Sequence, residues 1–190
     1  YARPAPTVTK SVRVDALFED LLEMIQQILP ENITLAVDIN KGHRLESDSD
    51  QLSQMLWNLC LNSIQAMSEG GVLRISVRPV TPQGGPATFR QETTQETAPD
   101  TQTCVVDTQR VDDAPQWLEI EITDTGSGIS EDVMVDIFEP FFTTKRDGTG
   151  LGLPTVHRIV ENHGGALELT SEPGVGTKFC IRLPGSEVPR

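Results

Sequence analysis

Apolar residues recur with the 3.6-residue period of a helix in three separate stretches of the chain. The first stretch follows Asp15 and stops at Pro30, the second extends from Leu52 to Met67, and the third extends from Pro154 to Asn162. Residues spaced three and four apart lie on one side of a helix, so each stretch predicts an amphipathic helix that covers a core. In the first helix, the expected core-facing residues are Leu17, Phe18, Leu21, Leu22, Ile25, Ile28 and Leu29.

Five other segments predict β-strands, because they are rich in β-branched residues or alternate between apolar and polar positions. They are residues 33–39, 72–78, 117–122, 166–170 and 178–183. In the third of these, Leu118, Ile120 and Ile122 alternate with polar residues and are expected to face inward. The combination predicts an α/β two-layer sandwich, in which a mixed sheet of about five strands is covered by about three helices.

The same pattern suggests how the chain is divided. We expect one domain at residues 11–184, a linker at residues 1–10 and a tail at residues 185–190. Within the domain, residues 79–115 are rich in Thr, Gln, Pro, Gly and acidic side chains and have little apolar periodicity. This composition predicts an exposed and mobile insertion between two strands, in which Val105 and Val106 could extend a hairpin.

A polar strip lies on the helix predicted between Leu52 and Met67, which Asp50 or Ser53 could start. Asn58, Asn62 and Gln65 share one face of that helix and are flanked by apolar side chains. Buried amides need partners, and amide oxygens are ligands that suit Mg²⁺ shared with a triphosphate. Two solvated helix residues remain an equally good interpretation of this motif alone.

Asp124 stands where the strand at residues 117–122 ends, and it is followed by Gly126 and Gly128. A carboxylate at a strand end can accept a hydrogen bond from an exocyclic amino group such as that of adenine, and glycines allow the backbone to approach a flat ring. An ordinary Asp-Gly turn is the simpler alternative for this segment by itself.

Gly148, Gly150 and Gly152 form a glycine loop that leads into the helix with Pro154 near its first turn. Free backbone N–H groups and the positive end of the helix dipole at such a point favour an anion. The G-x-G-x-G spacing and the loop that precedes it do not match the dinucleotide-binding fingerprint.

Three phenylalanines and a lysine lie between the two glycine motifs. Phe138 is interpreted as buried packing, whereas Phe141 and Phe142 could anchor a movable lid from which Lys145 reaches a phosphate. Buried packing is the commoner role of such an aromatic cluster.

In this order, the segments 58–62, 124–128, 138–145 and 148–153 resemble the N, G1, F and G2 boxes of the catalytic ATP-binding domain of bacterial sensor histidine kinases. That family belongs with gyrase, mismatch-repair and chaperone ATPases to the GHKL group, whose members share the Bergerat ATP-binding fold. The resemblance therefore implies a domain that binds ATP with Mg²⁺. It covers most of residues 11–184.

The resemblance also implies roles for single residues. Asn62, with Asn58, would support Mg²⁺, and both would form a catalytic group with Lys145. Asp124 would read the adenine amino group, and Thr177 would meet the base through water. Glycines 126 and 128 would shape the base pocket, and those at 148, 150 and 152 would cradle phosphates. Other nucleotide contacts are implied at Ile129, Phe138, Thr144, Thr149, Leu151 and Leu153.

The implied activity is transfer of the γ-phosphoryl group of ATP to a histidine on a separate dimerisation domain, with a response regulator downstream. None of the three histidines lies in the H-E-x-x-x-P pattern of the acceptor helix: His43 is expected at the surface, His157 within a helix and His163 at its end. The acceptor is therefore expected outside this chain, and Tyr1 to Pro4 is similar to the link that leaves such a dimerisation domain.

Two other functions stay open: an ATPase that drives a conformational cycle, and a nucleotide-responsive interaction module without catalysis. The residue at position 58 distinguishes the ATPase from the kinase. In the ATPase relatives, a glutamate four residues before the magnesium asparagine activates water, whereas the amide of Asn58 cannot accept a proton at neutral pH.

Composition narrows the classes of partner. The formal net charge is −13 over 190 residues, and Lys and Arg do not cluster, which argues against nucleic-acid binding. There is no apolar run long enough to cross a membrane and no secretory pattern, so we expect no membrane contact by this domain. Cys60, Cys104 and Cys180 are scattered, as in a protein of the reducing cytoplasm.

Overall fold

The computed structural model describes residues 10–80, 102–107, 116–145 and 148–187. In chain order the elements are β1 (Lys10–Arg13), α1 (Val14–Ile28), β2 (Ile33–Ile39), β3 (His43–Ser47), α2 (Ser49–Ala66), β4 (Gly71–Val80), β5 (Gln102–Asp107), β6 (Gln116–Asp124), α3 (Glu131–Met134), α4 (Gly152–Asn162), β7 (Ala166–Glu172) and β8 (Gly176–Glu187).

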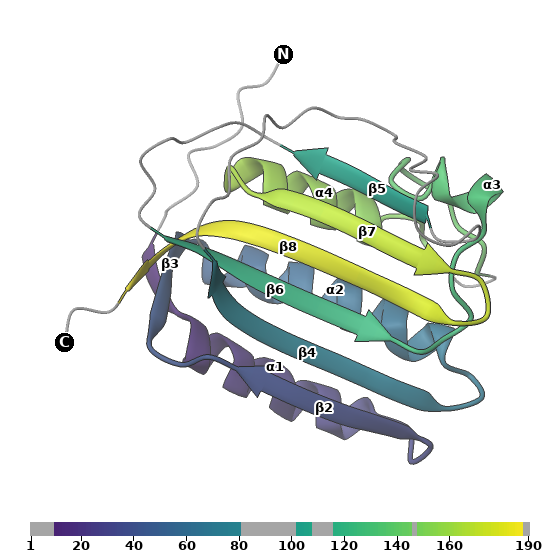
Figure 1. Ribbon diagram of the computed structural model, residues 1–190, viewed down its shortest axis with the longest axis horizontal. Coiled ribbons are helices and arrows are strands. Elements are labelled where there is room, and N and C mark those ends of the chain that lie inside the picture. Colours follow the sequence, from purple (N-terminus) through teal and green to yellow (C-terminus); the bar gives the residue numbers. More distant parts are fainter. Residues whose placement is uncertain (1–9, 81–101, 108–115, 146–147, 188–190) are drawn as a thin grey trace.

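The strands form one mixed sheet, shown in Figure 1. Its main path runs β1-β3-β8-β6-β4-β2, and β7 lies between β5 and the first part of β8. Only β2 and β4 pair in parallel among the described strands, and every other pairing is antiparallel. The long strand β8 joins the two parts, because it pairs with β7 over residues 176–182 and with β3 over residues 185–187.

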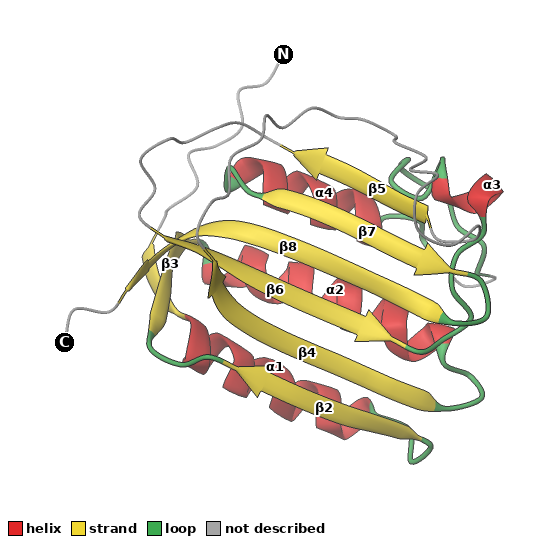
Figure 2. Cartoon of the chain, in the orientation of Figure 1, coloured by secondary structure: helices red, strands yellow, loops and turns green. Residues whose placement is uncertain are grey.

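Helices α1, α2 and α4 cover one face of the sheet, and none of the described helices lies on the other, open face (Figure 2). The core lies between these two layers. It consists of inward-facing residues of strands such as β4, β6, β7 and β8, together with the apolar faces of the helices that the sequence predicts. Side chains with at most 2% exposure include Phe18, Leu21, Ile25, Leu52, Leu56, Leu59, Leu73, Ile75, Leu118, Ile120, Ile122, Val156, Ile159, Val160, Leu167 and Leu169. The predicted two-layer α/β architecture is thus confirmed.

The expected number of strands was too low. The chain forms eight strands within its described residues. Strands β1 and β3 were not predicted, and β5 was anticipated only as a possible hairpin extension at Val105 and Val106. Each of these strands is only four to six residues long, and its hydrogen bonds come from partners far along the chain rather than from a local pattern. Strand β5 also lies within the segment interpreted as an insertion, as do the last two residues of β4; residues 81–101 and 108–115 are outside the described part.

Three local expectations also need correction. Helix α2 is capped by Asp48, whose carboxylate accepts from the backbone N–H of Asp50 at 2.9 Å, rather than by Asp50 or Ser53 as expected. Strand β8 continues to residue 187, so part of the expected tail belongs to the sheet. His43 was expected at the surface but lies in β3 with 7% of its side chain exposed, and its Nε2 is 3.3 Å from Asn40 Oδ1.

Candidate functional site

Helix α2 directs two side-chain amides toward the start of helix α4. Asn58 and Asn62 are half-buried on this face of α2, opposite to buried residues such as Leu56 and Leu59. The Asn58 Nδ2 atom lies 3.5 Å from the carbonyl oxygen of Gly152. A Cβ atom added at Gly152 would lie 3.7 Å from Asn62 Nδ2, so the backbone of α4 begins directly beside both asparagines.

Lys145 brings a positive charge to the same strip. Its ammonium donates to Asn62 Oδ1 at 2.9 Å and to Gln65 Oε1 at 2.5 Å. Burial lowers the pKa of Lys145, and attraction to Asp124 opposes that shift. The two amide oxygens therefore already converge on a cation, which is the arrangement that a bound Mg²⁺ would need.

Asp124 is the C-terminal residue of β6, and it is 3% exposed. Burial raises the pKa of its carboxyl, and the nearby Ser63 hydroxyl and the backbone N–H groups of Gly126 and Thr177 partly offset the rise. Gly126 N donates to Asp124 Oδ1 at 3.0 Å. No arginine or lysine pairs directly with Asp124 in the described part of the chain. A buried carboxylate without an ion-pair partner retains acceptor capacity for a ligand donor.

The loop after Asp124 is held between α2 and the β7–β8 turn. A Cβ atom at Gly126 would lie 2.7 Å from the carbonyl oxygen of Ala66, and one at Gly128 would lie 2.1 Å from that of Glu172. Gly128 also has φ +67°, a conformation that side chains other than glycine rarely adopt. Both glycines are thus required by close protein packing, which fixes the loop beside Asp124 before any ligand is present.

A hydroxyl network that the sequence analysis missed holds Thr177 beside Asp124. Thr177 pairs with Asp124 in the register of β6 and β8, and its Oγ1 lies 2.9 Å from Ser171 Oγ. Ser171 donates to the carbonyl oxygen of Gly176 at 3.0 Å and accepts from Ile129 N at 2.9 Å. Since Ser171 has one hydroxyl hydrogen, Thr177 donates to Ser171 and keeps its own lone pairs for another donor. The inward position of a serine in the alternating strand β7 was the available signal.

Residues 141–145 and 148–150 belong to a loop from which Lys145 reaches helix α2. Phe141 N donates to the carbonyl oxygen of Gly150 at 3.0 Å, so the two ends of the loop are joined. Gly150 has φ +66°, and a Cβ atom there would lie 2.4 Å from the carbonyl carbon of Phe141. Phe141 itself has φ +71° and 76% exposure. A bulky residue in this conformation is an outlier that costs on the order of 1–3 kcal/mol, so the surrounding loop must impose it.

The remaining predicted residues lie around the loop with different exposures. Phe138 is half-buried against the core, as interpreted, and its ring centroid lies 5.8 Å from that of His157. Ile129 and Leu153 are also half-buried against the core. Thr144, Thr149 and Leu151 are exposed. The structure thus brings the asparagines and Lys145 together and places Asp124 with Thr177, whereas these three exposed residues border the site.

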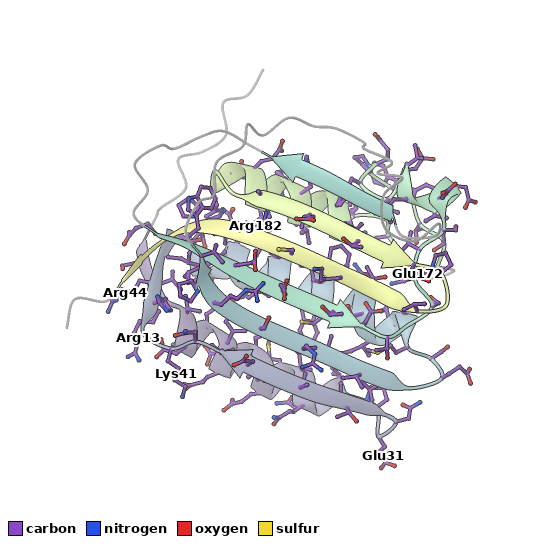
Figure 3. The ribbon with its side chains drawn as sticks, in the orientation of Figure 1. Arg13, Glu31, Lys41, Arg44, Glu172 and Arg182 are labelled. Carbon is purple, nitrogen blue, oxygen red and sulfur yellow. The ribbon has the colours of Figure 1, made fainter. Side chains whose placement is uncertain are left out.

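One other group of potential metal ligands occurs among the described residues, on the open face of the sheet. It consists of Glu119, Glu121 and Cys180. Glu119 accepts hydrogen bonds from Arg78 at 2.6 Å and from Arg182 at 2.8 Å; Figure 3 shows Arg182 on this face. The Glu119 carboxylate is therefore already satisfied, and the group is an ion-pair network. None of the helices described is long and apolar enough to span a membrane.

Comparison with known proteins identifies the family to which this chain belongs. Residues 47–187 match the family model described as histidine kinase-, DNA gyrase B- and HSP90-like ATPase. The chain therefore belongs to this family, and it is an ATP-binding domain with the GHKL-type fold.

The similar full-length proteins are sensor kinases. The sensor histidine kinase ZraS of Escherichia coli (strain K12) is 30% identical over 184 residues, which cover 96% of this chain and 32% of that protein. The sensor kinase CckA of Brucella abortus (strain 2308) is 34% identical over 170 residues, which cover 87% of this chain and 16% of that protein. The chain thus spans a third or less of the length of these two relatives.

Two solved structures show the same fold. The mycobacterial sensor histidine kinase MprB matches with a TM-score of 0.67 and 24% identity, covering 95% of this chain and 99% of that one. Full-length ShkA in complex with AMPPNP matches with a TM-score of 0.70 and 22% identity, covering 100% of this chain and 34% of that one.

Proposed function

We propose that this domain donates the γ-phosphoryl group of ATP to a histidine on a separate dimerisation domain, as part of a two-component sensor kinase. The sensor-kinase relatives support this proposal, and the main structural support is the residue at position 58. Asn58 is a neutral amide whose Nδ2 lies 3.5 Å from the Gly152 carbonyl oxygen. The resemblance implies a glutamate at this position in the ATPase relatives. An amide cannot remove a proton from water at neutral pH, but an imidazole needs no base because it attacks through a ring lone pair.

The adenine ring of ATP would bind against Asp124 and Thr177. The Asp124 carboxylate would accept from the adenine amino group, and the lone pairs of Thr177 would accept from a bridging water. Guanine has a carbonyl where adenine has this amino group. The carboxylate would therefore repel it, and the pocket would select ATP over GTP.

The phosphates would lie between α2 and the start of α4. Asn62 Oδ1 would hold Mg²⁺, with Asn58 beside it, and the first N–H groups of α4 would face the phosphate oxygens. Magnesium would neutralise part of the triphosphate charge, which an acidic protein of net charge −13 must offset locally. The residues of the chain would supply position and charge, the main contributions in phosphoryl transfer.

The proposed partners follow from this reaction. The acceptor domain would belong to the same parent kinase, and a response regulator would receive the phosphoryl group next. The domain would work on the cytoplasmic side, where ATP is available.

The test separates phosphoryl transfer from hydrolysis. The purified domain is expected to release phosphate from ATP very slowly but to transfer radiolabel from γ-labelled ATP to an added dimerisation domain from its own parent kinase. Asn62→Ala should abolish the transfer, whereas Asn40→Ala, an exposed asparagine before β3, should not. Rapid hydrolysis without the partner would refute the proposal in favour of an ATPase. Binding with neither activity would support a non-catalytic module instead.

A further inference from the structure

The ammonium of Lys145 lies against two amide oxygens, one of which is the proposed magnesium ligand of Asn62. It lies 2.9 Å from Asn62 Oδ1 and 2.5 Å from Gln65 Oε1, and both partners are amide oxygens on consecutive turns of one face of α2. Lys145 belongs to the loop between Phe141 and Gly150, and it lies 83 residues after Asn62 and 80 residues after Gln65 in the chain. These two hydrogen bonds therefore tie the loop to helix α2.

The backbone around Lys145 supports this position. Lys145 N donates to Thr143 Oγ1 at 3.1 Å, and Gly148 N donates to the carbonyl oxygen of Lys145 at 3.2 Å. A Cβ atom at Gly148 would lie 2.3 Å from Thr143 Oγ1, so the loop is compact at this point. The lysine is held from its backbone as well as from its ammonium group.

The ammonium and a magnesium ion would compete for the same oxygen. Mg²⁺ binds oxygen at about 2.0–2.1 Å, and Lys145 already lies 2.9 Å from Asn62 Oδ1. Two cations on one oxygen would repel each other at close range. The negative phosphates that arrive with Mg²⁺ give the ammonium another partner.

We propose that Lys145 is a latch that holds its loop against α2 through Asn62 and Gln65 while no nucleotide is bound, and that nucleotide with its metal displaces it from both amides onto the phosphates. Gln65 is a positioning residue in this device, because it holds Lys145 only while the site is empty. The displacement step rests on the proposed function, whereas the latch in the empty protein does not.

Removal of Gln65 is the informative change, because it leaves Asn62 intact. Gln65 is exposed, so Gln65→Ala is expected to fold normally. Gln54→Ala is a matched control: Gln54 is an exposed glutamine on the same face of α2, about 16 Å along the helix from Gln65. Lys145→Met removes the charge and keeps most of the side-chain length.

The measurement is hydrogen exchange of residues 141–145 and 148–152, with and without Mg²⁺ and a non-hydrolysable ATP analogue. In the empty protein, Gln65→Ala should speed exchange about tenfold, equal to about 1.4 kcal/mol of local stability. Gln54→Ala should match the wild type. With saturating analogue, Gln65→Ala should also match the wild type, whereas Lys145→Met should still exchange faster.

Each alternative outcome contradicts a defined part of the proposal. Equal exchange of Gln65→Ala and wild type in the empty protein would show that there is no latch. A difference that persists with bound analogue would show that Lys145 stays on Gln65. If calorimetry shows that the wild type binds no analogue, the proposed function fails, and the empty-state comparison still decides whether the latch exists.

Discussion

Asp124 offers the most direct test of the nucleotide site, because its predicted effects on binding and on stability have opposite signs. In Asp124→Asn, the Oδ1 atom can still accept from Gly126 N, but the second oxygen becomes an N–H₂ group that faces the adenine amino group. One charge-assisted hydrogen bond is lost, and a buried donor loses its acceptor. Such losses cost about 1.5–3 kcal/mol, so ATP affinity should fall about 10- to 150-fold. Affinity for GTP should fall less, because the new amide can donate to the guanine carbonyl.

Stability should change in the other direction. The pKa of Asp124 is raised in the folded protein because burial disfavours its charged form. The wild type is therefore favoured while this carboxyl is protonated, below its unfolded pKa of about 4, and loses that contribution as pH rises through the folded value. A neutral asparagine has no such loss. Asp124→Asn should then be as stable as the wild type or more stable at pH 7, with a weaker decline in stability above about pH 4.

The assays are calorimetric titration with ATP and GTP, and urea unfolding between pH 4 and pH 8. Asp38→Asn is the control, since Asp38 is an exposed aspartate on β2 and its replacement removes the same charge. ATP affinity of Asp124→Asn within twofold of the wild type would refute the assigned position of the base. Lower affinity together with a large loss of stability would mean that the carboxylate supports the fold instead.

Three other predictions concern different parts of the molecule. Hydrogen exchange at residues 148–152 should slow when a non-hydrolysable ATP analogue binds, and equal protection in both states would contradict ordering of this loop. Glu119→Gln should lower the free energy of unfolding by about 1–2 kcal/mol, because its half-exposed arginine partners lose an ion pair. It should leave ATP affinity unchanged. Unchanged stability or weaker ATP binding would count against this. Burial raises the pKa of Cys60 and of Cys180 to about 12. After treatment with a thiol reagent at pH 8, peptide mapping should therefore find both cysteines unmodified in the native protein and modified in urea. Modification in the native protein would contradict their burial.

Periodicity alone predicted the placement of several site residues. The spacing of four residues set Asn58 and Asn62 on one face of α2, and the predicted strand at residues 117–122 put Asp124 at a strand end, where β6 does end. These positions depend on rules that operate within one element, so they can be inferred before the partners of that element are known.

Contacts between distant elements were not accessible in the same way. The hydrogen bond from Lys145 to Gln65 joins a loop and a helix that no local pattern relates, and Gln65 was seen only as part of the polar strip. Strands β1 and β3 depend on pairing with each other and with β8, which a four- or five-residue segment does not specify. His43 was misplaced for this reason, since a histidine after Lys41 and Gly42 is typical of a turn.

Two buried carboxylates on β6 show how the surroundings separate a binding residue from a structural one. Glu119 and Asp124 have 5% and 3% exposure, but they lie on opposite faces because side chains alternate along a strand. On the open face, burial by itself would raise the pKa of Glu119, but hydrogen bonds from Arg182 and Arg78 and the charge of Arg182 outweigh it and lower the pKa. The acceptor sites of Glu119 are thus filled. On the helix face, burial prevails and raises the pKa of Asp124. The buried charge of Asp124 has no ion-pair partner among the described residues, so it destabilises the fold. A hydrogen-bond donor from a ligand would offset this destabilisation. For this reason the adenine amino group is assigned to Asp124 and not to Glu119.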